Sequence, residues 1–172
     1  MRSDPIQSSE SKKRKTAWME FMDHVRTTCL QKFSPLYFTV GVVEECAELA
    51  EELRKDSGDL IISEVGDVCW YVFALCDSLE DISPVPSSTL ETAELSDLFQ
   101  SCGKLCGSVK KWSRGDKEWN VFQEKIQKNV SDLLAILESI SPCTLSEGMQ
   151  NNIAKINKRK AAGTIKGDGN VR

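Results

Sequence analysis

Apolar residues recur at helical spacing from Thr16 onward, and this pattern predicts a series of amphipathic helices. The first such stripe consists of Trp18, Phe21, Met22, Val25 and Cys29. No stretch of the sequence alternates convincingly between apolar and polar positions, as a half-buried strand does. We therefore expect an all-α fold, a helical bundle of about six helices.

Turn and capping signals mark where these helices begin and end. Ser34 and Pro35 separate the first helix from the second, because proline suits the first turn of a helix. Thr144 and Glu147 form a capping-box pattern ahead of the last helix. The first predicted helix starts at Thr16, and the second runs from Pro35 to about Lys55. The other four are expected over about 60–79, 89–112, 118–140 and 144–161.

At 172 residues, the chain is long enough to bury roughly 70% of its unfolded surface in one domain. We expect a single domain over residues 16–162, between a disordered polar tail at 1–15 and a flexible tail at 163–172. The domain divides into a first hairpin at 36–80, a second hairpin at 89–140 and a closing helix at 144–161.

The two hairpins resemble each other in sequence. Glu45, Glu48, Glu64 and Asp67 of the first align with Ser101, Lys104, Asn129 and Asp132 of the second. Three of the four acidic positions are therefore replaced in the second hairpin. An internal duplication would give a four-helix core like a dimer fused into one chain. The alternative is that two amphipathic hairpins resemble each other through composition alone.

The acidic residues of the first hairpin form two pairs at i, i+3 spacing. Glu45 and Glu48 share one helix face, and so do Glu64 and Asp67. If the two helices pack antiparallel, the four carboxylates converge, and such a group needs a multivalent cation. Oxygen ligands suit Mg²⁺ or Mn²⁺. For the acidic run at 44–52 alone, a solvated helix face is the alternative.

The third predicted helix favours the metal site. Residues 68–76 are apolar nearly all the way round, which indicates a buried helix. Glu64 and Asp67 open this helix, and an uncompensated buried carboxylate is costly. The nearest upstream basic residues are Arg54 and Lys55. The acidic preference of helix N-termini would explain Glu64 but not Asp67, one turn further in.

Composition excludes several other classes of protein. The net charge of −4 gives no nucleic-acid-binding signature, and no apolar run approaches the ~18 residues of a membrane span. A single histidine, His24, excludes a di-iron carboxylate site and disfavours zinc.

The sequence contains seven cysteines, an odd number. Most of them lie at positions expected to be in the core, which is typical of reduced thiols inside the cell. We expect a cytoplasmic protein. Residues 12–15 are either a nuclear signal or a solvated basic tail.

The pattern Glu44-Glu45-x-x-Glu48 followed by Glu64-x-x-Asp67 and Tyr71 resembles the MazG-type nucleoside triphosphate pyrophosphohydrolases, of the all-α NTP pyrophosphatase superfamily. The run from Asn152 to Asp168 is similar to the closing helix and tail of this family. The resemblance implies Mg²⁺-dependent hydrolysis of a (deoxy)nucleoside triphosphate between its α- and β-phosphates, for sanitation or balancing of the nucleotide pool. It also implies a homo-oligomer, and we expect a dimer.

The resemblance assigns the metal ligands to Glu45, Glu48, Glu64 and Asp67. Glu44 and Glu45 are the candidates for catalysis, as groups that orient or deprotonate water. Candidates for substrate binding are Tyr71 near the nucleotide and, for the phosphates, Lys110, Lys111, Arg114, Asn152, Lys155, Arg159 and Lys166.

Residues 83–142 depart from the simple members of the family, which pass almost directly to the last helix. Dimeric dUTPases are similarly doubled, so the second hairpin could donate Lys104, Lys110 or Lys111 to the phosphates. Two other functions stay open at this point: a nucleotide-binding regulatory module with weak catalysis, and a helical interaction protein. The identity of the base and sugar and the number of metal ions stay open as well.

Overall fold

A computed structural model describes residues 5–79, 81–87, 92–116 and 118–164, and these contain six helices and no strand. The helices are α1 (Pro5–Thr28), α2 (Pro35–Lys55), α3 (Gly58–Asp77), α4 (Leu95–Ser113), α5 (Trp119–Ile140) and α6 (Leu145–Ala161). The expected all-α fold is confirmed. No helix in the described part of the chain is long and apolar enough to cross a membrane.

The capping signals read from the sequence act as predicted at two helices. The Ser34 hydroxyl accepts a hydrogen bond from the Tyr37 amide at 3.3 Å, one turn into α2. At α6, the Glu147 amide donates to the Thr144 hydroxyl at 3.2 Å, and the Thr144 amide donates to the Glu147 carboxylate at 2.7 Å. These bonds satisfy amide groups that have no partner inside the helix.

Two helix starts differ from the predictions. Helix α1 begins at Pro5, eleven residues before the predicted start at Thr16, and so includes part of the expected polar tail. This polar stretch of serine, glutamate and lysine lacks an apolar stripe, but proline suits the first turn and the helix continues into the amphipathic part. Residues 1–4, 88–91 and 165–172 lie outside the described residues, and so does most of the expected C-terminal tail.

Helix α4 begins at Leu95, about six residues later than predicted, because a capping box forms there. The Glu94 amide donates to the Asp97 carboxylate at 2.9 Å. This pair is an acidic variant of the serine or threonine capping box, which explains why the start was not read from the sequence.

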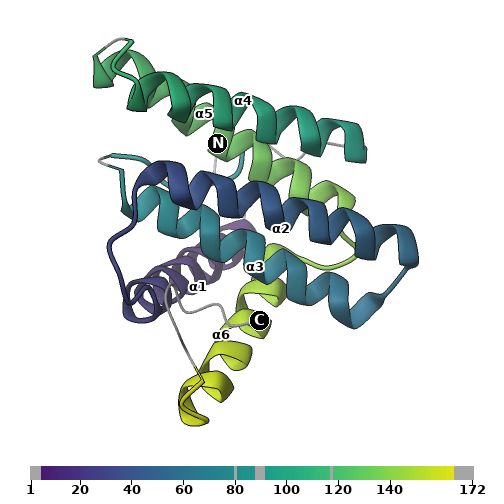
Figure 1. The fold of residues 1–172 in the computed structure, drawn as a ribbon. Helices are drawn as coiled ribbons and strands as arrows, with labels where there is room; N and C mark the ends of the chain where they lie inside the picture. Colours follow the sequence, from purple (N-terminus) through teal and green to yellow (C-terminus); the bar gives the residue numbers. More distant parts are fainter. Residues whose placement is uncertain (1–4, 80, 88–91, 117, 165–172) are drawn as a thin grey trace.

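The two hairpins pack against each other, as Figure 1 shows. Helices α2 and α3 form the first, α4 and α5 form the second, and the main contact between them is α2 against α4. Helices α1 and α6 pack on the other side of α3. The four helices α2–α5 therefore form a core that α1 and α6 cover from one side. Duplication as its origin stays a hypothesis.

Helix α3 is the centre of this bundle and is buried on nearly every side. Phe73 packs against Trp18 and Phe21 of α1, with ring centroids 5.2 and 5.0 Å apart. The indole N–H of Trp70 donates to the Thr28 hydroxyl at 3.0 Å. Burial of each such large side chain stabilises the fold by about 1.5–3 kcal/mol. These contacts fix α1 against the C-terminal half of α3.

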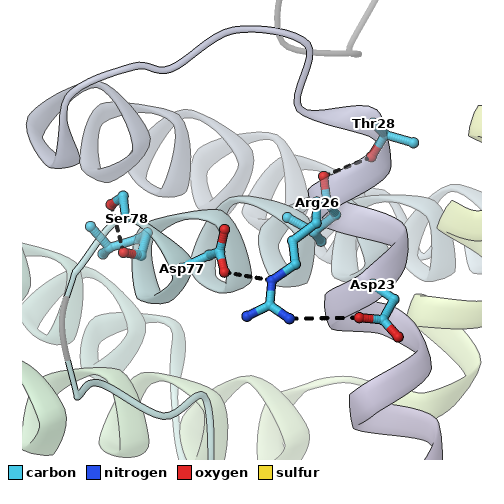
Figure 2. A network of polar contacts seen from close by, with 7 residues as sticks. Asp23, Arg26, Thr28, Asp77 and Ser78 are labelled. Carbon is cyan, nitrogen blue, oxygen red and sulfur yellow. Dashed lines mark hydrogen bonds and ion pairs between the residues drawn. The ribbon is translucent and has the colours of Figure 1, made fainter.

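A polar contact joins the ends of the same two helices. The Arg26 guanidinium donates through Nε to the Asp77 carboxylate at 2.7 Å, and its Nη1 lies 3.6 Å from Oδ1 of Asp23 (Figure 2). The side chains of this network are only slightly buried, so their ion pairs add at most about 1 kcal/mol to the stability of the fold.

Close approach of α6 to α3 depends on glycine. A Cβ added at Gly66 would overlap the carbonyl oxygen of Gly148, so these two backbones meet without side chains between them. This contact brings the next turns of α6, which carry Asn152 and Lys155, beside the start of α3.

Candidate active site

Three carboxylates converge at the interface of α2 and α3. Glu45 and Glu48 of α2 and Glu64 of α3 each offer an oxygen, and these oxygens lie within 4.8 Å of one another. Glu45 is 3% exposed, Glu64 is half-buried and Glu48 is exposed, so the cluster runs from the interior to the surface. The i, i+3 spacing on α2 and the antiparallel hairpin together produce this arrangement, as the sequence predicted.

Asp67 lies beside this cluster, but α6 holds its carboxylate. The Asn152 amide donates to Asp67 Oδ1 at 2.7 Å, and the Lys155 ammonium forms an ion pair with Oδ2. Lys155 also donates to the Ser63 hydroxyl at 3.1 Å. Three of the four expected carboxylates therefore form the cluster, and the fourth, Asp67, lies beside it with a basic partner 88 residues away.

Burial and mutual repulsion disturb the titration of the cluster. Burial, followed by the charge of Asp67, raises the pKa of Glu45 to about 8. The same two causes raise the pKa of Glu64 to about 7, although Lys155 opposes the shift. The charge of Glu48 adds to both. At neutral pH the cluster therefore holds protons that ordinary carboxyl groups would release.

The residues present fit a divalent cation. One oxygen of Glu64, Oε2, is buried with no hydrogen-bond partner in the described part of the chain. Carboxylate oxygens are the donors that Mg²⁺ and Mn²⁺ prefer, and a cation would offset the repulsion that raises both pKa values. The arrangement can therefore hold a metal ion at the surface end of the cluster, where Glu48 is exposed.

The other candidates on the first hairpin lie close to the cluster. Glu44 is exposed on α2, and its charge contributes to the raised pKa of Glu45. Tyr71 is buried, with its ring against Gly41 and edge-on to Trp70 at 5.1 Å. The cavity of about 10 Å³ between Tyr71 and Asp67 has room for no more than a water molecule.

The basic candidates are spread over three places. Lys155 contacts the site through Asp67, and Arg159 is half-buried one turn further along α6. Lys110, Lys111 and Arg114 are exposed at the end of α4, where Arg114 pairs with Asp116 at 2.6 Å. None of the contacts found among the described residues joins these three to the carboxylates. Lys166 lies outside the described residues.

Sequence reasoning missed one feature, a cavity of about 420 Å³ where α1 ends, α2 begins and α3 ends. Arg26, Lys32, Phe33, Phe38 and Asp77 are among the residues that line it. Its walls come from three segments, and the outer two lie about 50 residues apart, so no local sequence pattern predicts this cavity. The Arg26–Asp77 pair drawn in Figure 2 is part of this lining.

The helical hairpin of α2 and α3 therefore carries three carboxylates that can hold a divalent cation. Residues 33–88 match the family model of the MazG nucleotide pyrophosphohydrolase domain, which confirms the resemblance noted above. Comparisons with curated proteins and with solved structures gave no match.

The matched segment contains all of α2 and α3, and therefore the three clustered carboxylates and Asp67. The match supports nucleotide pyrophosphohydrolase activity in general, and enzymes of this type generally use divalent metals.

Proposed function

We propose that the protein hydrolyses a nucleoside or deoxynucleoside triphosphate between its α- and β-phosphates, releasing a nucleoside monophosphate and pyrophosphate. The observation that carries this proposal is the meeting of Glu45, Glu48 and Glu64 within 4.8 Å, inside the segment that matches the MazG domain. The cofactor is Mg²⁺, with Mn²⁺ as a substitute, because both favour oxygen ligands.

Glu45, Glu48 and Glu64 would hold the cation, with Asp67 beside them. Mg²⁺ bound there supplies positive charge against the phosphates and Lewis acidity toward the attacking water. Asp67 is held in one orientation by the Asn152 amide and the Lys155 ammonium.

Proton transfer falls to a carboxylate at the edge of the cluster. Glu44 is exposed next to the buried Glu45, so it can accept the proton of the attacking water. Glu45 is the second candidate, because it is one of the clustered carboxylates. We assign Lys155 to phosphate binding, because this basic residue contacts Asp67 and Ser63 beside the cluster. The remaining assignments are Tyr71, Lys110, Lys111, Arg114, Asn152, Arg159 and Lys166, which rest on the resemblance.

The biological role that follows is sanitation or balancing of the nucleotide pool in the cytoplasm. We assign a homodimer, because α2 carries an exposed apolar stripe of Leu36, Val40 and Val43, with Val40 59% exposed. Light scattering of the purified protein, compared with Val40→Glu, tests the assembly. A monomeric wild-type protein would contradict it.

The test of the activity is a panel of canonical and modified (deoxy)nucleoside triphosphates with Mg²⁺, with monophosphate and pyrophosphate as the products measured. Glu48→Gln should lower kcat/KM by about 100-fold or more while the circular dichroism of the helices is unchanged. Glu51→Gln is the matched control, since Glu51 is exposed on the same helix and pairs with Lys55 instead.

Calorimetric titration with Mg²⁺ separates this function from a helical interaction protein. Wild-type protein should bind the ion and Glu48→Gln should bind it much more weakly. Absence of binding, or binding that the substitution leaves unchanged, would favour an interaction protein with an acidic surface.

A further inference from the structure

The second hairpin brings together the residues that align with the acidic cluster. Ser101 and Lys104 lie on α4, and Asn129 and Asp132 lie on α5. The Asn129 amide donates to the Lys104 carbonyl oxygen at 3.1 Å and to the Ser108 hydroxyl at 2.9 Å. The seam between α4 and α5 therefore corresponds to the seam between α2 and α3 that carries the carboxylates.

Part of this seam carries basic residues where the first hairpin carries acidic ones. A cavity of about 370 Å³ lies along it, and Lys104, Lys111, Lys125 and Lys128 line it. None of the described residues that line this cavity is acidic, although the whole chain carries a net charge of −4. Such a local excess of lysine in an acidic protein attracts anions.

A second cavity of about 280 Å³ adjoins the first and shares Lys104 and Lys128 with it. Ser101 lines this second cavity, is 3% exposed, and has a hydroxyl without a hydrogen-bond partner among the described residues. A buried hydroxyl without a partner is costly unless a ligand or water binds it. Two acidic residues, Asp97 and Asp132, also line this cavity, and Asp132 forms an ion pair with Lys128.

The seam is open to solution. Helix α6 packs on α3 beside the carboxylate cluster, whereas α4 lies on the far side of α2 and α3 from α6 (Figure 1). A Cβ added at Gly103 or Gly107 would meet nothing within 4 Å, so the α4 backbone here is accessible to a ligand.

We propose that the seam between α4 and α5 is a second, metal-independent site that binds the phosphate chain of pyrophosphate or of a nucleoside triphosphate. Four ammonium groups and the Ser101 hydroxyl supply donors for phosphate oxygens. Two adjoining cavities that share two lysines fit an anion with more than one phosphate group. Binding at this site does not require hydrolysis at the carboxylates. Pyrophosphate and a nucleoside triphosphate present the same phosphate groups to it.

The test is calorimetric titration of the full chain in EDTA, in one arm with pyrophosphate and in the other with a triphosphate analogue that cannot be cleaved between its α- and β-phosphates. Saturable binding is expected in at least one arm, and the tighter arm identifies the source. Lys104→Gln combined with Lys128→Gln should weaken binding about tenfold or more. Lys15→Gln combined with Lys55→Gln removes the same charge from exposed sites elsewhere and should leave binding unchanged.

Two further variants separate this site from the carboxylates and from a purely structural role. Glu48→Gln should bind the anion in EDTA as the wild type does. Asp132→Asn should bind it more tightly, because it frees Lys128 from its ion pair.

Four results would overturn the proposal. Three of them are no saturable binding in either arm, an equal loss in both lysine double variants, and binding that requires Mg²⁺ and disappears in Glu48→Gln. Equal or tighter binding of a short single-stranded DNA would likewise assign the lysines to general attraction of polyanions.

Discussion

Replacement of Glu45 by glutamine should stabilise the metal-free protein at neutral and higher pH. Burial and neighbouring carboxylates raise the pKa of Glu45 from 4.5 to about 8. A carboxyl group whose pKa is higher in the folded state keeps a proton that the unfolded chain releases. Stability therefore falls as the pH rises from about 4.5 to about 8, and it is unaffected below that range.

The size of the effect follows from the shift. The difference of 8 − 4.5 = 3.5 pH units corresponds to an upper limit of about 5 kcal/mol above pH 8, at 1.36 kcal/mol per unit. At pH 7 the same reasoning gives about 3 kcal/mol. Glutamine carries no charge at any of these pH values, so Glu45→Gln avoids this loss. The buried amide offsets part of the gain, because it also needs hydrogen bonds.

Urea denaturation followed by circular dichroism between pH 4.5 and 8.5 measures the prediction, in EDTA and again with Mg²⁺. In EDTA, the stability difference between variant and wild type should grow with pH. Added Mg²⁺ should stabilise the wild type and have little effect on the variant, because ligand binding stabilises only a state that binds. Glu51→Gln, an exposed control on the same helix, should change stability by less than about 1 kcal/mol.

Two results would refute the reasoning. If Glu45→Gln is less stable than the wild type in EDTA at pH 8, the carboxylate stabilises the fold through its contacts. If both proteins lose stability equally with rising pH, the raised pKa belongs to another group.

Two more substitutions test how α6 supports the site. Lys155→Met leaves the carboxylate of Asp67 buried without its ion-pair partner, so this substitution should cost about 3 kcal/mol of stability and lower kcat. Urea denaturation measures the stability and steady-state kinetics measure kcat. An unchanged kcat would show that Lys155 does not belong to the active site. Gly66→Ala places a Cβ against the Gly148 carbonyl oxygen and should destabilise the protein by about 1–3 kcal/mol, whereas Gly103→Ala, which meets nothing, should not. Equal thermal stability of the two alanine variants would contradict the close packing of α3 on α6.

Much of the helical structure could be predicted because its signals are local. The Ser34-Pro35 and Thr144–Glu147 patterns begin helices where they were expected, since a cap involves residues within one turn. The start of α1 was missed because a polar stretch lacks the apolar stripe that marks a packed helix. The start of α4 was missed because its cap uses the acidic pair of Glu94 and Asp97.

The sequence by itself determined which carboxylates share a helix face, because i, i+3 spacing fixes side-chain direction within one helix. Given antiparallel packing of the two helices, this spacing predicted the cluster of Glu45, Glu48 and Glu64. Only the tertiary structure decided that Asp67 pairs with Lys155, since that contact joins residues 88 positions apart through the packing of α6 on α3. Burial of Glu45, and with it the raised pKa, was likewise decided by packing, because desolvation depends on the neighbours that the fold brings together.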